Sequence, residues 1–257
     1  MSDTTRIDDL VVLGRAAPEP ISDGRHTVCL GGYSEEVGYV RLYPTQKRMT
    51  QCRRWNVVSV LVEHAKPDDH RKESYKIQGS KENWDQLHTK IKKVGRLSKA
   101  ERIQLVDQLA GDCTGRLNET HTSLGMVKPF EIIDYSLEER DDPTYQVTLD
   151  GRRQEGKNEY PHKLYLTYRC EECAIKGPHR QHCIEWGIYR YWDKYDDPEG
   201  VCDALKLTDS RYQHYFFVGN LRHQPTAYIV ISDLRFSEKD MLNAGISVDD
   251  QSSLDDW

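Results

Sequence analysis

The amino-acid sequence predicts a mainly β protein of the α+β class, and three observations point to it. Short apolar runs rich in β-branched and aromatic residues recur along the chain, each bounded by glycine, proline or polar turns. Residues 163–169 alternate apolar and polar side chains with the period of a half-buried strand. One well-signalled helix separates two such β-rich stretches. The 257 residues are enough for two domains of roughly 100–150 residues each.

The first half contains the clearest strand signals. Residues 27–30 and 38–43 are apolar runs joined by a polar loop with flanking glycines, which predicts a hairpin. Residues 56–63 (NVVSVLVE) are dense in β-branched side chains and predict a strand that ends before Pro67. A further strand is expected at 131–133, after a loop that ends in Lys128-Pro129.

The helix is expected to begin after Ser98, in the segment SKAERIQLVDQLA. Glu101 follows three residues later, and this spacing is typical of a capping box. Ile103 and Val106 fall on one face of the helix, and Gly111 can close its end. We expect this helix to plug a small barrel or to connect two of them.

The second half returns to β structure around one more helix. Strands are predicted at 163–169, 215–218 and 228–231, and a helix at 184–195. The strongly polar stretch 137–160 is expected to be a loop or linker. The acidic tail after Asp240 is expected to be frayed.

Composition and charge limit the classes of protein that fit. No apolar run approaches the roughly 20 residues of a membrane span, and the acidic, polar N-terminus predicts no signal peptide, so we expect a cytoplasmic protein without membrane contacts. The net charge is −6, but residues 41–102 hold 16 Lys and Arg against 7 Asp and Glu, an excess of nine positive charges. This segment indicates a surface for phosphates or an acidic partner, unless it only neutralises the acidic remainder.

A cluster of cysteines and histidines follows the strand at 163–169. The seven cysteines are an odd number, unevenly spaced, which favours thiols or metal ligands over a disulfide framework. Cys170 and Cys173 form a C-x2-C pair, and His179 is well placed as a third ligand of a structural Zn²⁺ ion. Either His182 or Cys183 is expected as the fourth ligand. The alternative is a set of reduced cysteines and surface histidines without metal.

Aromatic and basic residues alternate in several parts of the positive segment, a pattern that suits stacking on bases and pairing with phosphates. We expect DNA or RNA, single-stranded, as the partner. The candidate nucleic-acid-binding residues are Arg41, Tyr43, Lys47, Arg48, Arg53, Arg54, Arg71, Lys72 and Lys76.

Catalytic signals are weak. The chain contains none of the common glycine-rich phosphate-binding or nucleophile-elbow motifs. Carboxylates and a lysine at Asp68, Asp69, Glu73 and Lys76 resemble the ligand set of a metal-dependent nuclease, although their spacing is loose. No catalytic residue is therefore predicted, and a non-enzymatic role is favoured.

Several segments, in order, resemble an uncharacterised family of dual-OB-domain proteins from bacteria and archaea. In the first half they include 28–29, 39–44, 71–75 and 123–125, and Trp55 with the strand after it. In the second half they are Cys170 and Cys173, His179, 184–186 and 215–220. The family pattern near the metal has an acidic residue after the tryptophan, whereas this chain has Gly187 after Trp186, so any role of that residue is in doubt here.

The resemblance implies two small OB-like β-barrels, a connecting helix and a C-terminal zinc-bound helix. It divides the chain into residues 1–125, with the basic segment and helix, 126–240, with the zinc site, and an acidic tail, 241–257. It also implies a place in prokaryotic antiviral defence systems, as an accessory subunit beside an effector protein. The leading hypothesis is thus a nucleic-acid-binding or sensing module. The alternatives are a protein-interaction scaffold that binds no nucleic acid, and a nuclease.

Overall fold

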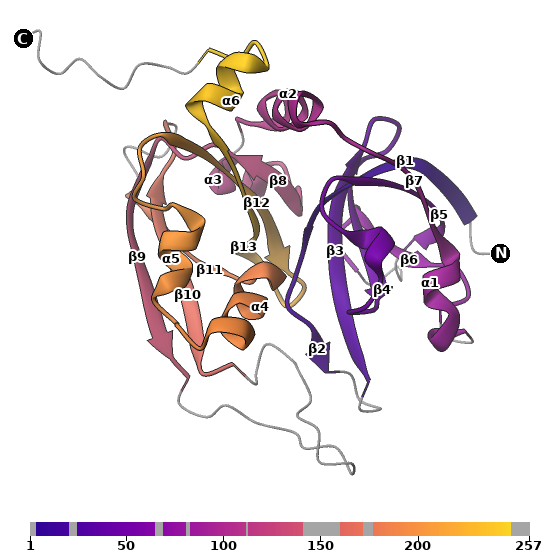
Figure 1. The fold of residues 1–257 in the computed structure, drawn as a ribbon. Coiled ribbons are helices and arrows are strands. Elements are labelled where there is room, and N and C mark those ends of the chain that lie inside the picture. Colours follow the sequence, from indigo (N-terminus) through magenta and orange to yellow (C-terminus); the bar gives the residue numbers. More distant parts are fainter. Residues whose placement is uncertain are drawn as a thin grey trace, which may run out of the picture.

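The strands of the first half close into a barrel in the computed structural model (Figure 1). The structure describes residues 4–20, 25–64, 69–80, 83–111, 113–140, 160–171 and 177–247. The barrel strands are β1 (Thr4–Arg15), β3 (His26–Ser34), β4 (Gly38–Thr45), β5 (Asn56–His64) and β6 (Ser74–Ile77). β1 pairs with both β3 and β5, and β4 pairs with β6 in parallel. Counted along the chain, the order around the barrel is 1-2-3-5-4-1, which is that of an OB fold.

Shorter elements extend this first barrel. β2 (Glu19–Pro20) pairs with β3, and β7 (Ile91–Arg96) pairs with the outer edge of β5. One 3-10 turn, η1 (Thr50–Cys52), lies between β4 and β5. A second, η2 (Trp84–Gln86), leads into α1 (Leu87–Lys90) ahead of β7.

The second half repeats the same order in a more open sheet. Its strands are β8 (Leu124–Val127), β9 (Glu131–Glu139), β10 (His162–Arg169), β11 (His179–Cys183), β12 (Tyr212–Leu221) and β13 (Gln224–Ser237). The sheet runs β8-β12-β13-β11-β10-β9, with β11 and β13 parallel. β8 and β9 are consecutive in the chain but lie at opposite edges, with Pro129 between them. Together they take the place of one long first strand, so the expected pair of OB-like barrels is confirmed as a closed barrel and an open one.

In the described part of the chain, five helices accompany the second sheet and the connection between the barrels. α4 (Trp186–Tyr195) and α5 (Gly200–Leu205) lie between β11 and β12 in the chain. α2 (Lys99–Leu109) and α3 (Thr114–Glu119) join the first barrel to β8, and α6 (Glu238–Asn243) follows β13. α2 and α6 lie side by side across the top of the molecule in Figure 1, where Lys99 pairs with Asp240 at 2.6 Å.

The buried apolar side chains of the described residues form three clusters. One fills each barrel, and the third lies between the barrels beneath α2 and α6. β1 contributes to two of them, because Leu10 and Val12 point into the first barrel whereas Val11 and Leu13 face β12 and β13. The continuous apolar run at 10–13 is therefore explained by burial on both faces of the strand. The run at 215–218 has the same cause.

The second barrel partly covers the outer face of β3 and β4. Tyr33 and Tyr39 are cross-strand neighbours on that face, and the Tyr39 ring stacks on Phe217 of β12 with centroids 6.0 Å apart. A side chain at Gly31 would overlap the Phe217 ring, so glycine permits this close approach. In OB folds the corresponding strands often carry the oligonucleotide. Here much of that surface is occupied by the protein itself.

Buried polar contacts reinforce the packing between the barrels. Arg41 of β4 donates to the Ser123 hydroxyl at 2.9 Å and to its carbonyl at 3.0 Å. Glu73 accepts from the Ser123 hydroxyl at 2.6 Å and from its backbone amide at 3.0 Å. Burial lowers the pKa of Arg41 to about 10. Because Arg41 is only 5% exposed, it is a structural tie between the barrels and does not face a ligand as expected.

The structure confirms the capping box, in which the Ser98 side chain accepts from the Glu101 amide and Glu101 accepts from Ser98. It corrects two boundaries. β9 continues to Glu139, into the stretch predicted as a loop, whereas 141–159 lie outside the described residues. α6 forms where fraying was expected, although residues 248–257 also lie outside that part. Among the described residues, no helix combines the length and hydropathy needed to span a bilayer.

Candidate metal centre and basic hollows

Three metal-ligating side chains meet at one end of the second barrel. Cys170 directly follows β10, His179 begins β11, and Cys113 immediately precedes α3. Their ligand atoms all lie within 4.8 Å of one another, and the Cys113 sulfur is 3.5 Å from Nε2 of His179. Both cysteines are buried and the histidine is half-buried. The cluster therefore joins the β10–β11 hairpin to the connection between the barrels.

The surroundings of His179 orient it as a ligand. Its Nδ1 lies 3.2 Å from the Thr114 hydroxyl, while Nε2 faces the Cys113 sulfur. This arrangement fits a tautomer in which Nδ1–H donates to Thr114 and the bare Nε2 binds a metal. Burial lowers the pKa of His179, which keeps the imidazole neutral. The Tyr168 ring packs against it with centroids 5.2 Å apart.

The donor set fits zinc, which takes thiolate and imidazole ligands in a compact tetrahedron. Three ligands are present among the described residues. Cys113 is disulfide-bonded in the structure, so a metal here requires the reduced thiol of that residue. Cys170 is not in a disulfide. Cys173, the other half of the C-x2-C pair, lies outside the described residues and stays a prediction.

The structure does not bring His182 or Cys183 to this cluster. Along β11 the side chains alternate, so His182 points to the face opposite His179, where its ring packs on Tyr165 at 5.3 Å. Cys183 shares the face of His179 but lies four residues further, which is about 13 Å along a strand. It is fully buried in the barrel core, and burial raises its pKa well above the usual range.

Cys113 was missed because nothing local marks it. It is 57 residues before Cys170 in the chain, and no other cysteine or histidine lies within five residues of it. Only the packing of α3 beside β10 and β11 brings its sulfur to His179. The sequence shows only a cysteine without an assigned role at this position, and a single cysteine does not specify a partner.

Among the residues that the structure describes, basic side chains from both barrels line two hollows at the junction. The smaller has a volume of about 350 Å³ and is formed by Lys47 and Arg48 after β4 with Trp186 and Arg190 of α4. Lys47 Nζ lies 5.2 Å from the centroid of the Trp186 ring, and the Arg190 guanidinium lies 6.0 Å from it. Cations from both barrels thus meet over one tryptophan.

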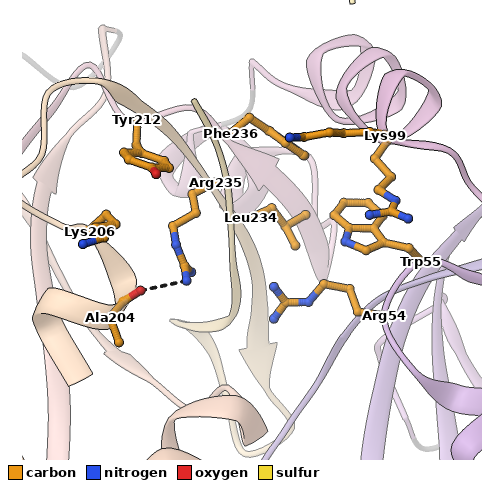
Figure 2. A pocket seen from close by; sticks show the side chains of 10 residues that line it. Arg54, Trp55, Lys99, Ala204, Lys206, Tyr212, Leu234, Arg235 and Phe236 are labelled. Carbon is orange, nitrogen blue, oxygen red and sulfur yellow. Dashed lines mark hydrogen bonds between the residues drawn. The ribbon is translucent and has the colours of Figure 1, made fainter. Parts of the chain in front are cut away.

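The larger hollow has a volume of about 400 Å³ and lies between α2 on one side and α5 and β13 on the other (Figure 2). Its aromatic lining comes from Trp55, Tyr212 and Phe236. Arg54 connects the two hollows, because it forms an ion pair with Glu185, the residue before Trp186. The basic residues of the larger hollow are Arg54, Lys99, Arg102, Lys206 and Arg235.

The predicted nucleic-acid-binding residues are therefore divided among several places. Lys47, Arg48 and Arg54 line the hollows, and Arg53 is exposed beside them in sequence. The others belong to the β4–β6 side of the first barrel: Tyr43 lies 6.0 Å from Lys76 Nζ, Lys72 is exposed, and Arg71 is bound to Asp69. Sequence reasoning missed Lys99, Arg102, Lys206 and Arg235, since their elements meet only in the folded chain.

The carboxylates of the nuclease hypothesis have other partners. Asp69 accepts two hydrogen bonds of 2.8 Å from the Arg71 guanidinium, and Glu73 binds Ser123. The pKa of Asp69 falls to about 2 because these bonds to Arg71 outweigh the effect of its burial. Asp68 lies outside the described residues. These contacts give Asp69 and Glu73 structural roles and do not turn them toward a common metal ion.

A buried histidine lies behind the larger hollow. His214 Nδ1 is 2.9 Å from the Asp233 carboxylate, and Nε2 is 3.1 Å from the Lys206 carbonyl. Both partners can only accept, so both ring nitrogens carry protons and the ring is an imidazolium. Burial alone would lower the pKa of His214, but the charge and hydrogen bond of Asp233 raise it above its usual value.

We expect His214 to make stability fall as the pH rises. Its folded-state pKa lies above the unfolded value of about 6.5, so its contribution is complete below that pH and is lost as the pH passes the folded pKa. Urea unfolding of the wild type and of His214→Gln between pH 5.5 and about 9 should give curves whose difference shrinks toward high pH. NMR titration that finds a neutral His214 ring near pH 6 would contradict the assignment.

The fold and these sites define a protein of two OB-type barrels with a Cys2His ligand group and a basic junction. Residues 6–108, the first barrel and nearly all of α2, match DUF8758, a domain of unknown function. No curated protein matches the chain.

Two solved structures show a distant likeness to the chain. One is titled as the tetrameric p202 HIN2, with 4% identity, a TM-score of 0.31 and coverage of 92% of each chain. The other is a replication protein A heterotrimer bound to ssDNA, with 9% identity and a TM-score of 0.35, covering 95% of this chain and 51% of that one. The OB assignment rests on the strand order described above, not on these two structures.

Proposed function

We propose that this protein binds single-stranded nucleic acid along the junction of its two barrels, and that a structural zinc ion holds the second barrel in shape. One observation carries the proposal. Among the described residues, eight basic side chains and no carboxylate line the two junction hollows, and three of these cations are paired from behind with Glu185, Asp233 and Asp240. The whole chain has more acidic than basic residues, so such a concentration of cations is not a result of composition. Phosphates are the ligands that it fits.

The usual binding face of the first barrel is partly covered, and this favours the junction as the binding site. Because β12 packs against β3 and β4, a nucleic-acid strand cannot bind along the usual OB surface there without displacing Phe217. The junction offers cations from both barrels instead. Tyr212 is half-buried in the larger hollow and presents an aromatic surface to a base.

The resemblance to dual-OB proteins adds a cellular role to the proposal. In it, the protein is an accessory subunit that detects nucleic acid beside an effector protein in a prokaryotic defence system. The zinc ion has a structural role there, because its ligands join the β10–β11 hairpin to α3 and lie apart from both hollows in the chain.

The test is binding of labelled single-stranded DNA and RNA at several salt concentrations. Replacing Lys47 and Arg48 with Ala should weaken binding about tenfold or more, and reduce the slope of log K against log salt by about 1.4. The matched control is Lys92→Ala with Lys93→Ala, which removes two exposed lysines of β7 that line neither hollow. Lys47 and Arg48 are better test positions than Arg54, because removal of Arg54 would leave Glu185 buried without its ion pair.

Two results would contradict the proposal. Equal losses in the junction variant and in the β7 control would mean that binding follows total charge and has no defined site. Absence of binding at low salt would favour the protein-interaction scaffold, in which an acidic protein occupies the same cations.

A further inference from the structure

The outer face of β10 and β11 is the counterpart, in the second barrel, of the partly covered face of the first. With β8 and β9 counted together as the first strand, β10 and β11 are the second and third strands of their barrel, as β3 and β4 are of theirs. In Figure 1, β9 and β10 lie at the left of the second barrel, whereas the first barrel lies to its right. The packing that covers β3 and β4 is therefore made by the other side of the second barrel.

Each of these two faces carries a cross-strand pair of rings. In the first barrel, Tyr33 of β3 is paired with Tyr39 of β4, and their ring centroids are 5.5 Å apart. In the second barrel, Tyr165 of β10 is paired with His182 of β11, and their centroids are 5.3 Å apart. Because the two pairs lie on equivalent strands, the surroundings of the first pair indicate what the second can bind.

The ring pair of the first barrel has an aromatic occupant. Phe217 stacks on Tyr39 with an angle of 25° between the ring planes, and it comes from β12 of the other barrel. A flat ring laid against the pair is thus a ligand that this kind of face accepts. Tyr165 and His182 are half-buried and lie on the side of the second barrel away from that contact.

A planar cation lies beside the second ring pair. The Arg180 guanidinium is 4.0 Å from the centroid of the Tyr165 ring, and the Arg180 side chain is 46% exposed. Ser136 and Glu138 of β9 accept hydrogen bonds from it at 3.1 and 2.5 Å, and these bonds fix its direction. The face therefore presents a tyrosine, an imidazole and a guanidinium in one arrangement, and each of these groups can stack on a flat ring.

The outward side chains favour a nucleobase over an aromatic side chain of another protein. Alternation along the two strands directs six side chains outward: Lys163, Tyr165, Thr167, Arg169, Arg180 and His182. None of them is aliphatic, whereas the cluster that holds Phe217 includes Val11 and Leu13. A nucleobase is flat and has polar edges, so it can stack on the rings and exchange hydrogen bonds with the hydroxyl, imidazole and guanidinium groups.

This face is suited to bases and not to phosphates. Two of its cations already pair with carboxylates of β9, Arg180 with Glu138 and Arg169 with Glu131. Little positive excess remains to attract a backbone, in contrast to the junction hollows, whose lining side chains include no carboxylate among the described residues.

We propose that the outer face of β10 and β11 stacks an unpaired base of the bound strand on Tyr165, beside Arg180 and His182. The inference rests on the proposed function and adds a second contact to it. The junction holds phosphates through charge, and this face holds a base through stacking.

The first experiment measures binding of a labelled single-stranded oligonucleotide to full-length variants at several salt concentrations. Tyr165→Ala should weaken binding about tenfold, the usual effect of losing one stacked base. The slope of log K against log salt should stay that of the wild type, because no phosphate contact is lost. Tyr165→Phe keeps the ring and should bind like the wild type. The matched control is Tyr195→Ala, which removes an exposed tyrosine of α4 that is not on this face.

The second experiment locates the contact in the unmodified protein, so it does not depend on the folding of a variant. Oligonucleotides with 5-iodouracil at a single position are irradiated in the complex, and the cross-linked peptide is identified by mass spectrometry. We expect an adduct on Tyr165 or His182 for at least one position of the modified base.

The outcomes separate this inference from the proposed function. Equal binding by Tyr165→Ala and Tyr195→Ala, with adducts confined to the junction, would overturn the base-stacking face and leave strand binding at the junction intact. A lower salt slope in Tyr165→Ala would also overturn it, because the face would then be contacting phosphates. Failure of the wild type to bind any strand would overturn both, and would leave this face to an aromatic side chain of a partner protein.

Discussion

Replacing Cys113 with Ser is expected to abolish zinc binding and to lower the free energy of unfolding by about 3–5 kcal/mol. The reason is the position of this cysteine between α3 and the β10–β11 hairpin, where its sulfur lies 3.5 Å from His179 Nε2. Without the thiolate, the ion loses one of its ligands and the hairpin loses its link to α3. Elemental analysis of protein purified under reducing conditions should find one zinc per wild-type chain and far less in the variant.

Cys183→Ser is the matched control for this result. Cys183 is also buried in the second barrel but lies outside the cluster. Its variant should therefore keep zinc, and its free energy of unfolding should fall only by the cost of burying a hydroxyl. Intact-protein mass spectrometry distinguishes the alternative chemistry. A wild-type protein without zinc, whose mass is two hydrogens lower than that of the fully reduced chain and whose disulfide maps to Cys113 in a non-reducing peptide digest, would refute the zinc site.

Gly31→Ala is expected to destabilise the protein by about 1–3 kcal/mol, through strain between the barrels. The added methyl would overlap the Phe217 ring, which is fully buried. The barrels can accept the methyl only by moving apart, and the apolar cluster between them then packs less well. Urea unfolding monitored by tryptophan fluorescence and by circular dichroism measures this loss.

Gly95→Ala provides the same chemical change in a strand that has room for it. Its new methyl would lie 3.6 Å from Val57 Cβ, an ordinary contact, so we expect a change of less than about 0.5 kcal/mol. Adding Phe217→Leu to Gly31→Ala should recover part of the loss, because the two sites are coupled. Equal effects of Gly31→Ala and Gly95→Ala would mean that the barrels do not depend on this close approach.

The parts of the fold that could be predicted are those with local signals. The β-branched run at 56–63 and the Ser98–Glu101 capping box both act within a few residues, and both appear as expected. β1 was missed because its outer half, Thr4–Asp9, is polar and its inner half lacks alternation. That lack of alternation has a tertiary cause, since Val11 and Leu13 are buried against the other barrel.

The candidate sites divide in the same way. Cys170 and His179 are close in the sequence and were predicted together, whereas Cys113 reaches them only through the position of α3. Arg41 matched the local pattern of an exposed basic-aromatic strand, but its side chain is buried in a contact with Ser123 that no local pattern encodes. The junction hollows combine α2, α5 and β13, so their chemistry exists only after the barrels pack.

The apolar cluster between the barrels has a practical consequence for how the protein can be divided. The matching domain of unknown function ends at residue 108, and a fragment cut there would contain a closed barrel. Such a fragment would expose Val11, Leu13 and Trp55 to water, in a patch that the full chain covers with β12 and β13. Exposed patches of this kind promote aggregation. Separate fragments of the barrels would therefore aggregate when expressed, and the two barrels should be produced together as one chain.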